Sequence, residues 1–561
     1  MVKKSSKSSK SQRTISPLAG LNVQLVSALL ILMFLYTMVT LGAVFQMPLL
    51  EENSRNLVIH NGQRFALQKI ADTTEDEEDS IKTSDSEQAV EESGHGNAEK
   101  IETLRQRFPT MVKDDDMEEI DHPGQMYANI GKSGPIEKLK VPKFWADSPE
   151  VNDAYGEGGV RGFLGNHGQH LMTLSEAKSV GSLWNDGKAK RETIYISVAS
   201  YRDPECMPTI ESILARAKYP KRIRVAVIDQ RDAKHDDEFC GPPKSCDGED
   251  STSAYCRYKD QVDLFHVEAR LSIGPVFARH LAHRMYRGEY YAMQVDSHIR
   301  FTQDWDDDLI WQWKSARNEM TVLTTYLSDI IDSIDPVTHQ SKHPGRPIMC
   351  KSGYEGQGKL KHLRHGQQPE GLAGIKGQPT LEPFWAAGFS FARAHFVIQI
   401  PYDQYLPMVF QGEEISMGLR GFTYGYDYYA AERSVCFHMY AIKENKEKRK
   451  RVKLFWENSN LYRGAELEAM KRLNGIIGMG EKGEVYDHTD ESKYGLGRVR
   501  STKKFFETFG IHTDTQTIED GLCTFVGKPM MQEIGGHLRS DTMGINYDEI
   551  TYRFVDPKKK K

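Results

Sequence analysis

The sequence predicts an α/β protein with a parallel sheet, and three consecutive segments support this fold class. Residues 194–198 form a short apolar run, which predicts a buried strand. Residues 208–217 place apolar side chains at i, i+3, i+4 and i+7 from Ile210, as one helix face requires, and residues 223–228 predict a second strand. A strand, a helix and a strand at this spacing form a βαβ unit, which implies parallel strands with helices on the faces of the sheet.

A second helix is expected to begin near Gly274-Pro275 and to stop at Gly288. One of its faces is apolar. The other face carries Arg279, His280, His283, Arg284 and Arg287. Residues 290–295 predict the next strand, which ends in Asp296-Ser297-His298. Ligands of such sheets bind at the carboxyl ends of the strands, so these ends are where a site is expected.

Composition and charge exclude several classes of protein. The chain has 561 residues, of which 39% are hydrophobic and 27% charged, which is ordinary for a globular protein. Its net charge of −6 is uneven, because residues 72–121 hold 18 acids and 5 bases. Basic residues gather at the two ends and the rest is close to neutral. A broad nucleic-acid-binding surface is therefore not expected.

One membrane span is predicted near the N-terminus. No charged residue occurs between Arg13 and Glu51, and residues 25–45 are mostly apolar, which is long enough to cross a bilayer. A cleaved signal peptide is the alternative, but its apolar region would be shorter and would end in a small-residue cleavage site. Basic residues before the span predict a type II, single-pass protein in the Golgi or ER membrane, with its catalytic domain in the lumen.

The chain is divided into five parts on these grounds. Residues 1–24 are a basic cytosolic tail and residues 25–45 the anchor. Residues 46–190 are read as an acidic stalk with a Gly-rich lead-in. Residues 191–450 form the catalytic domain and residues 451–561 a C-terminal extension.

Three cysteines, Cys240, Cys246 and Cys256, lie in one polar segment. A zinc site would require closely spaced pairs, which are missing. One disulfide among the three is expected in an oxidising compartment, and the sequence does not choose the pair.

Asp296-x-His298 is the most informative chemical pattern in the chain. A carboxylate and an imidazole one residue apart at a strand end can hold one cation, and this pair suits Mn²⁺ or a similar divalent ion. The alternative is an aspartate that caps a turn beside a surface histidine. A second acidic group, Asp304, Asp306, Asp307 and Asp308, directly precedes an expected helix at 309–313. We interpret these acids as helix caps rather than metal ligands.

Residues 191–510 resemble the polypeptide N-acetylglucosaminyltransferases of glycosyltransferase family 60, which include the enzyme that modifies hydroxyproline on Skp1. The matching residues occur in order and at the expected spacing. They are Ser200-Tyr201-Arg202-Asp203-Pro204-Glu205-Cys206, Gly274-Pro275 with Ala278-Arg279, Gly288-Glu289-Tyr290, Gln294 with Asp296-Ser297-His298, Trp305-Asp306, Trp385-Ala386-Ala387-Gly388-Phe389, Gln411-Gly412-Glu413-Glu414, Tyr424-Gly425-Tyr426-Asp427, His438 with Tyr440, and Tyr494-Gly495-Leu496-Gly497 with Arg500.

The resemblance implies a GT-A fold with a Rossmann-like nucleotide-sugar-binding sheet, a UDP-sugar donor and a divalent metal. Polypeptide N-acetylgalactosaminyltransferases of the same fold hold the metal with Asp-x-His and a distant histidine. Asp296 and His298 match the first part. His438 is the candidate third ligand. The alternative interpretation is that His438 is a core residue of an apolar strand at 435–440.

The ends of the first two strands are the expected bed for the nucleotide. Ser200 and Tyr201 are expected to contact uridine, and Asp229 to accept from ribose or uracil. Arg279 is a candidate for binding the diphosphate. An equally weighted alternative is that Arg279 lies on a solvated helix face and binds no ligand.

Glu413 and Glu414 are candidates for orienting an acceptor hydroxyl or for stabilising developing positive charge. The alternative interpretation is that both acids belong to the first turn of a helix and have no role in the reaction. Trp385 is a candidate for stacking on sugar, or else a core residue.

The predicted function is metal-dependent transfer of N-acetylglucosamine from UDP-GlcNAc to a hydroxyl of a polypeptide, with retention of configuration as the resemblance implies. Two alternatives stay open. The enzyme uses another donor or a glycan acceptor, or the chain is a catalytically silent, lectin-like module.

Overall fold

The computed structural model describes residues 117–130, 134–143, 171–247, 252–343, 346–365 and 375–551. Among these residues, no helix combines the length and the apolar character that a bilayer crossing needs. The predicted tail and the predicted anchor at 25–45 lie outside the described residues.

An eight-stranded sheet organises the fold, and its strands follow the order β13-β15-β10-β14-β8-β5-β6-β7. Strands β7, β6, β5 and β8 are mutually parallel, and β10 and β15 run in the same direction, whereas β13 and β14 run against them. The fold class is therefore mixed α/β with a mostly parallel sheet. The bounds of these strands are β5 Ile194–Tyr201, β6 Ile223–Arg231, β7 Val262–Glu268, β8 Tyr291–Asp296, β10 Thr321–Thr324, β13 Thr380–Glu382, β14 Phe389–Arg393 and β15 Asp427–Ala430.

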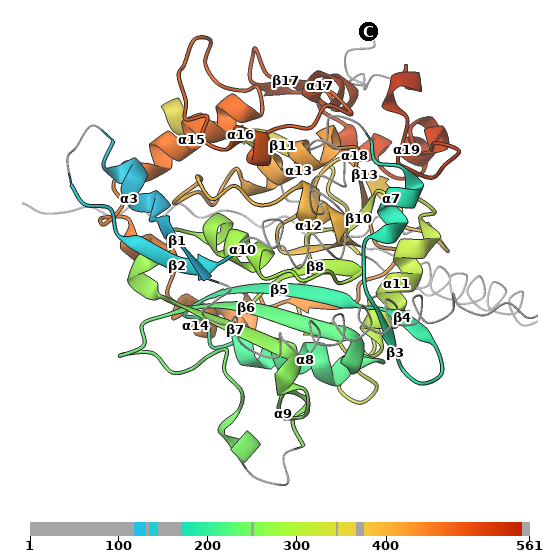
Figure 1. The fold of residues 1–561 in the computed structure, drawn as a ribbon. Coiled ribbons are helices and arrows are strands. Elements are labelled where there is room, and N and C mark those ends of the chain that lie inside the picture. The colour runs from blue at the N-terminus through green and yellow to red at the C-terminus, as the bar shows by residue number, and fades with distance from the viewer. Residues whose placement is uncertain are drawn as a thin grey trace, which may run out of the picture. The chain divides into compact units, whose positions relative to one another are not determined.

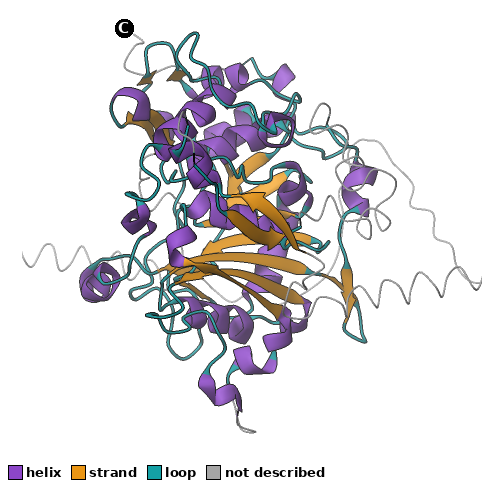
Figure 2. Cartoon of the chain, turned by 60° about the vertical axis from the view of Figure 1, so that its left-hand side comes forward, coloured by secondary structure: helices purple, strands orange, loops and turns teal. Residues whose placement is uncertain are grey.

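Helices cover both faces of this sheet (Figures 1 and 2). Helices α10 (Pro275–Arg284), α12 (His395–Gln399) and α13 (Glu413–Thr423) lie on one face. Helices α8 (Cys206–Arg216) and α11 (Trp305–Ser315) lie on the other. The two parallel strands and the helix predicted between residues 194 and 228 are all present. The apolar runs of the strands are buried on both sides, and the helix buries one face.

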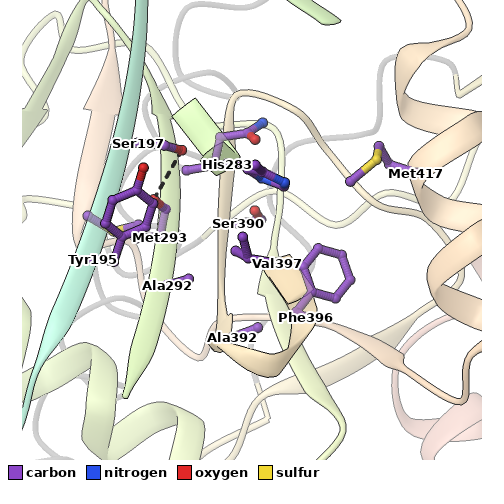
Figure 3. A pocket seen from close by; sticks show the side chains of 11 residues that line it. Tyr195, Ser197, His283, Ala292, Met293, Ser390, Ala392, Phe396, Val397 and Met417 are labelled. Carbon is purple, nitrogen blue, oxygen red and sulfur yellow. Dashed lines mark hydrogen bonds between the residues drawn. The ribbon is translucent and has the colours of Figure 1, made fainter. Parts of the chain in front are cut away.

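Figure 3 shows the interior between the sheet and the first group of helices. A small pocket there is lined by Tyr195 and Ser197 of β5 and by Ser390 of β14. His283 of α10 and Met417 of α13 complete it from the helix side. Burial lowers the pKa of His283 to about 3, so this imidazole is a neutral core group.

The alternative that placed Arg279 on a solvated face of the second helix is wrong, because this face is buried. Arg279, His280, His283 and Arg284 are all at most 7% exposed. Segments distant in sequence cover them: His280 Nδ1 lies 2.8 Å from the carbonyl oxygen of Tyr402. Arg284 donates to the carbonyl oxygen of Pro142 at 3.1 Å and also pairs with Glu118.

Folded structure also begins before residue 191, inside the predicted stalk. Strands β1 (Met117–Asp121) and β2 (Lys138–Pro142) pair antiparallel, and Leu139 and Val141 are buried. The two strands bind Arg284 of α10 through Glu118 and the carbonyl oxygen of Pro142. Their apolar residues alternate within a strongly charged stretch, so charge alone gave a misleading boundary.

The C-terminal residues likewise belong to the same unit as the sheet. Arg500 forms a buried ion pair with Asp427 of β15 at 2.9 Å, and Cys350 is disulfide-bonded to Cys523. Helix α17 (Thr502–Phe509) packs on α13. Residues 451–551 therefore pack against the sheet that holds the strand ends.

Three disulfides join Cys206 to Cys240, Cys246 to Cys256 and Cys350 to Cys523. The Cys246–Cys256 bond is the one predicted within the cysteine-rich segment. Cys240 instead reaches Cys206 at the start of α8, a pairing that the sequence analysis did not consider.

The remaining elements are shorter and frame these parts. They are α3 (Pro123–Ala128), α7 (Leu174–Ser179), β3 (Leu183–Asn185), β4 (Lys190–Glu192), α9 (Ala254–Arg257), β9 (Ile299–Phe301), β11 (Ser352–Glu355), β12 (His362–His365), β16 (Cys436–His438), α14 (Lys446–Lys450), α15 (Ala465–Ile476), α16 (Glu491–Tyr494), β17 (Ile511–His512), β18 (Thr517–Ile518), α18 (Leu522–Phe525) and α19 (Lys528–Glu533), with short 3-10 turns between them.

Candidate active site

Asp296, His298 and His438 come together at the carboxyl end of β8. Asp296 is the last residue of that strand, and the chain turns through His298 into β9. Strand β16 pairs antiparallel with β9 and sets His438 opposite Ile299, next to His298. A ligand atom from each of the three side chains lies within 4.8 Å of the others. This is the one group of potential metal ligands found among the described residues.

The donor atoms of this group suit a divalent cation. His298 Nε2 lies 2.8 Å from His438 Nε2, which lies 3.5 Å from Asp296 Oδ2. Burial, with a contribution from neighbouring His298, lowers the pKa of His438 to about 4, so the ring is neutral at pH 7, as a ligand must be. Two imidazole nitrogens with one carboxylate oxygen match the preferences of Mn²⁺-like ions. A side chain at position 388 would come within 3.1 Å of Asp296 Oδ2, so Gly388 leaves this carboxylate free of contact on that side.

A second carboxylate orients His298. Asp203 Oδ2 lies 2.8 Å from His298 Nδ1, and Arg449 donates to both oxygens of Asp203 at 2.9 Å. Burial favours a protonated Asp203, but the hydrogen bond from His298 and the charge of Arg449 outweigh it and lower the carboxyl pKa. An ionised carboxylate only accepts, so the Asp203 contact favours the tautomer with the proton on Nδ1 and the Nε2 lone pair toward the cluster, while Arg449 Nη2 also lies 3.1 Å from Nδ1.

Arg279 connects the cluster to Glu413. Its Nη2 lies 2.7 Å from Asp296 Oδ1, and its Nη1 pairs with Glu413. Glu413 also accepts from the Tyr402 hydroxyl at 2.7 Å. Arg279 is 7% exposed, so the alternative of a solvated helix face is wrong. Two carboxylates engage its guanidinium, and its contact with a diphosphate stays a prediction.

Glu413 and Glu414 occupy the first turn of α13, as the helix interpretation predicts, and both also lie in the site. Glu414 accepts from the backbone N–H of Ala387 at 3.0 Å and from the Tyr326 hydroxyl. His365 Nδ1 lies 3.9 Å from the same carboxylate. Burial raises the pKa of Glu414 to about 7, so this acid is poised to carry a proton near neutral pH.

This raised pKa makes the stability of the metal-free protein depend on pH. Between about pH 4.5 and 7 the folded state retains a proton on Glu414 that the unfolded chain has lost, so the free energy of unfolding falls as the pH rises through this window. The loss is on the order of 1–3 kcal/mol. We expect Glu414→Gln to flatten the difference between urea unfolding curves recorded at pH 5 and pH 7.5 in EDTA. An unchanged difference would show that Glu414 is ionised throughout.

The expected nucleotide bed lies at the adjacent strand ends. Ser200 of β5 stands opposite Asp229 of β6 in the parallel register. Both are buried, and the Ser200 hydroxyl has no hydrogen-bond partner among the described residues. Burial raises the pKa of Asp229, which accepts from Arg231 Nε at 2.9 Å. Tyr201 is partly buried, and its hydroxyl donates to Glu457 at 2.5 Å.

Trp385 lies in the core. It is 1% exposed and packs beside Gly418 of α13 and the ring of Tyr402. This burial favours the core interpretation over stacking on sugar.

The acids before α11 form ion pairs rather than a metal site. Asp306 pairs with Arg222, Asp307 with Lys218 and Asp308 with Arg433. The cap interpretation is also wrong in detail, because the N-cap residue Asp304 makes no side-chain capping bond. The three paired acids nevertheless occupy the first helical turn, where negative charge is favoured.

Several residues of the site were missed as such from the sequence. They are Asp203, Tyr326, Tyr402, Arg449 and Glu457. Only Asp203 had a sequence signal that could have identified it, because it lies within the Ser200–Cys206 motif. The others reach the site through contacts between residues 88 to 256 positions apart.

Comparison with known proteins identifies the family. A family model described as "Glycosyltransferase (GlcNAc)" matches residues 193–254 and 235–515, which together span more than half of the chain. No curated protein matches the sequence.

Solved structures match at low sequence identity and low TM-score. GalNAc-T7 with UDP, GalNAc and Mn²⁺ is 14% identical with a TM-score of 0.37, and the match covers 64% of this chain and 65%, under two thirds, of that chain.

TarS 1–349 of S. aureus in complex with UDP-GlcNAc is 14% identical with a TM-score of 0.28, covering 53% of this chain and 74% of that chain. The mannosyltransferase PcManGT of Pyrobaculum calidifontis with GDP-Man and Mn²⁺ is 12% identical with a TM-score of 0.27, covering 54% and 79%. The family match includes every strand end and side chain of the cluster described above. The chain belongs to the glycosyltransferase (GlcNAc) family.

Proposed function

We propose that this glycosyltransferase transfers N-acetylglucosamine from UDP-GlcNAc to a hydroxyl of a polypeptide, at hydroxyproline, threonine or serine. A GT-A fold and membership of glycosyltransferase family 60 are part of this proposal. The observation that carries it is the convergence of Asp296, His298 and His438 at the strand ends, beside the Arg279–Glu413 pair. A silent lectin-like module would have no need of such a cluster.

Asp296, His298 and His438 are the residues that would hold Mn²⁺ or another divalent cation. When bound, the cation neutralises the diphosphate charge of the donor. Asp203 keeps His298 in the tautomer that binds metal. Arg279 acts as a positioning residue, because it fixes Asp296 and Glu413 relative to each other.

The donor nucleoside is proposed to lie on the ends of β5 and β6. The buried, unpaired hydroxyl of Ser200 supplies a hydrogen-bonding group there, and Asp229 and Tyr201 flank it. Glu413, Glu414 and Tyr326 would then face the sugar and the incoming hydroxyl. Their role is to orient the acceptor and to stabilise positive charge on the sugar.

The test is a matrix of donors and acceptors with the full-length protein in detergent and Mn²⁺. UDP-GlcNAc, UDP-GalNAc, UDP-glucose and GDP-mannose are offered with peptides that carry a single hydroxyproline, threonine or serine, and with oligosaccharides. Mass spectrometry of the products should show addition of N-acetylhexosamine to peptide from UDP-GlcNAc. Transfer only to oligosaccharides, or from another donor only, would contradict the proposal, and the absence of both transfer and donor hydrolysis would favour the silent module.

Retention is proposed for the stereochemistry. The acceptor then attacks from the face of the leaving diphosphate, whose oxygen takes the proton, so neither Glu413 nor Glu414 is an indispensable base. We expect Glu413→Gln to lower kcat by about 10- to 100-fold without abolishing transfer, since it removes one partner of Arg279. Azide should not restore the rate. A large anomeric coupling in the NMR spectrum of the product would mean a β-linkage and would overturn retention.

We also propose a lumenal location in the Golgi or ER, behind the anchor predicted at 25–45. Three disulfides support an oxidising compartment. In sealed microsomes, protease should spare the chain from residue 46 onward. Digestion of that region in intact vesicles would contradict the type II topology.

A further inference from the structure

An exposed aromatic pair borders the candidate site. Phe410 is 50% exposed and Trp456 is 39% exposed, and their ring centroids are 6.1 Å apart. Phe410 lies three residues before Glu413. Trp456 directly precedes Glu457, which binds the hydroxyl of Tyr201. The pair is therefore tied by short stretches of chain both to the carboxylates of α13 and to the nucleotide bed.

The segment that carries Trp456 is firmly anchored. Phe455 is buried against Gly274, and Asn458 Nδ2 donates to the carbonyl oxygens of Ala269 and Ser272 at 2.6 and 2.9 Å. Alongside these anchors Trp456 and Leu454, which is 60% exposed, point outward. Neither is buried in the core, and clustered exposed apolar side chains on an anchored segment mark an interaction site.

Positive charge precedes Trp456 along the chain. Residues 446–453 hold six basic residues and one acidic residue. Two of the basic residues already form ion pairs: the exposed Lys448 with Glu205, and Arg449, which is largely buried, with Asp203. Arg451 and Lys453 are exposed, and no carboxylate lies within 4 Å of either among the described residues. These two cations are free to attract an acidic partner.

We propose that this aromatic–basic surface, defined as Phe410, Arg451, Lys453, Leu454 and Trp456, binds the acceptor polypeptide, and that the acceptor is acidic around the modified residue. The inference rests on the proposed function, because it names the substrate class of the same site. Aromatic rings provide rigid apolar contact for an extended chain, and the cations supply charge complementarity. A neutral glycan would use the rings but would gain nothing from the cations.

The experiment uses the full-length protein with UDP-GlcNAc, Mn²⁺ and three peptides that share one hydroxyl residue. The flanking residues are acidic, neutral or basic. We expect kcat/KM to fall in that order, by about 10-fold or more between the acidic and basic peptides at low ionic strength, with a smaller ratio at high salt.

Two double variants separate the two parts of the surface. Arg451→Glu with Lys453→Glu should abolish or reverse the preference among the peptides. Phe410→Ser with Trp456→Ser should raise KM by about 10-fold for all three peptides and lower kcat much less. Lys503→Glu with Lys528→Glu, on the exposed surfaces of α17 and α19, and Val485→Ser, at a side chain 84% exposed, are the matched controls and should behave like the wild type.

The outcomes distinguish this inference from the proposed function. Equal transfer to all three peptides would overturn the acidic acceptor and leave the function intact. No transfer to any peptide would overturn both. An equal gain for all peptides on charge reversal would assign the surface to the chain's own acidic residues 72–121. A KM effect of the aromatic variant confined to oligosaccharide acceptors would assign it to a glycan.

Discussion

Asp296→Asn should lower kcat of sugar transfer by about a thousand-fold, because it removes the one carboxylate of the proposed metal cluster and several kcal/mol of charge stabilisation with it. His298→Ala should have an effect of the same order, since it removes a ligand whose position is fixed by Asp203. Initial rates with UDP-GlcNAc and a hydroxyl-bearing peptide, measured over a range of Mn²⁺ concentrations, provide the readout.

The controls separate metal binding from folding. Mn²⁺ binding, followed by electron paramagnetic resonance or calorimetry without donor, should weaken in both variants. Asp203→Asn, which alters only the support of His298, should cost about 10- to 100-fold in Mn²⁺ affinity or rate. Asp307→Asn changes an acid of the neighbouring group and should leave Mn²⁺ binding unchanged. Turnover within a few-fold of wild type in both Asp296→Asn and His298→Ala would mean that the metal site is misassigned.

The elements that place this cluster were predictable because their signals are local. The strands β5, β6 and β8 are mostly buried and mostly apolar, and Asp296 is the last residue of β8. Parallel strands bring their carboxyl ends to one edge, so the sequence alone places Ser200, Asp229 and Asp296 near one another.

The rest depends on contacts between distant segments. His438 reaches His298 only through the pairing of β16 with β9, 140 residues apart, and it was a candidate through the family resemblance rather than through its local pattern. Arg279 lies on the polar face of an amphipathic helix, which normally predicts solvent exposure. It is buried because Asp296 and Glu413 approach it from other elements, and nothing local reports such a partner.

The acids before α11 illustrate a different limit. A cluster of aspartates at a helix start has several physical explanations, and the sequence ranks them only by general preference. The structure distinguishes them residue by residue: Asp306 is fully buried beside Arg222, whereas Asp307 and its partner Lys218 are both about 40% exposed. Two neighbouring aspartates are therefore expected to contribute very differently to the free energy of unfolding.

Asp306→Ala is accordingly expected to lower the free energy of unfolding by about 3 kcal/mol, because it leaves the buried charge of Arg222 with only the partly exposed Asp307, 3.7 Å away. Asp306 also accepts from the backbone N–H groups of Lys218 and Tyr219 at 2.6 and 3.1 Å, so the substitution frees two further donors. Urea unfolding followed by circular dichroism should show an earlier midpoint.

Asp307→Asn is the matched control for Asp306→Ala and should cost no more than about 1 kcal/mol, because an exposed ion pair contributes little. A second variant shows whether the loss comes from the unpaired charge. Replacing both partners, Asp306→Leu with Arg222→Met, removes the buried charges together and should recover part of the stability lost in Asp306→Ala. If Asp306→Ala and Asp307→Asn shift the midpoint equally, the first turn of α11 acts through its helix dipole rather than through the buried pair, and the contrast drawn here between the two aspartates would be wrong.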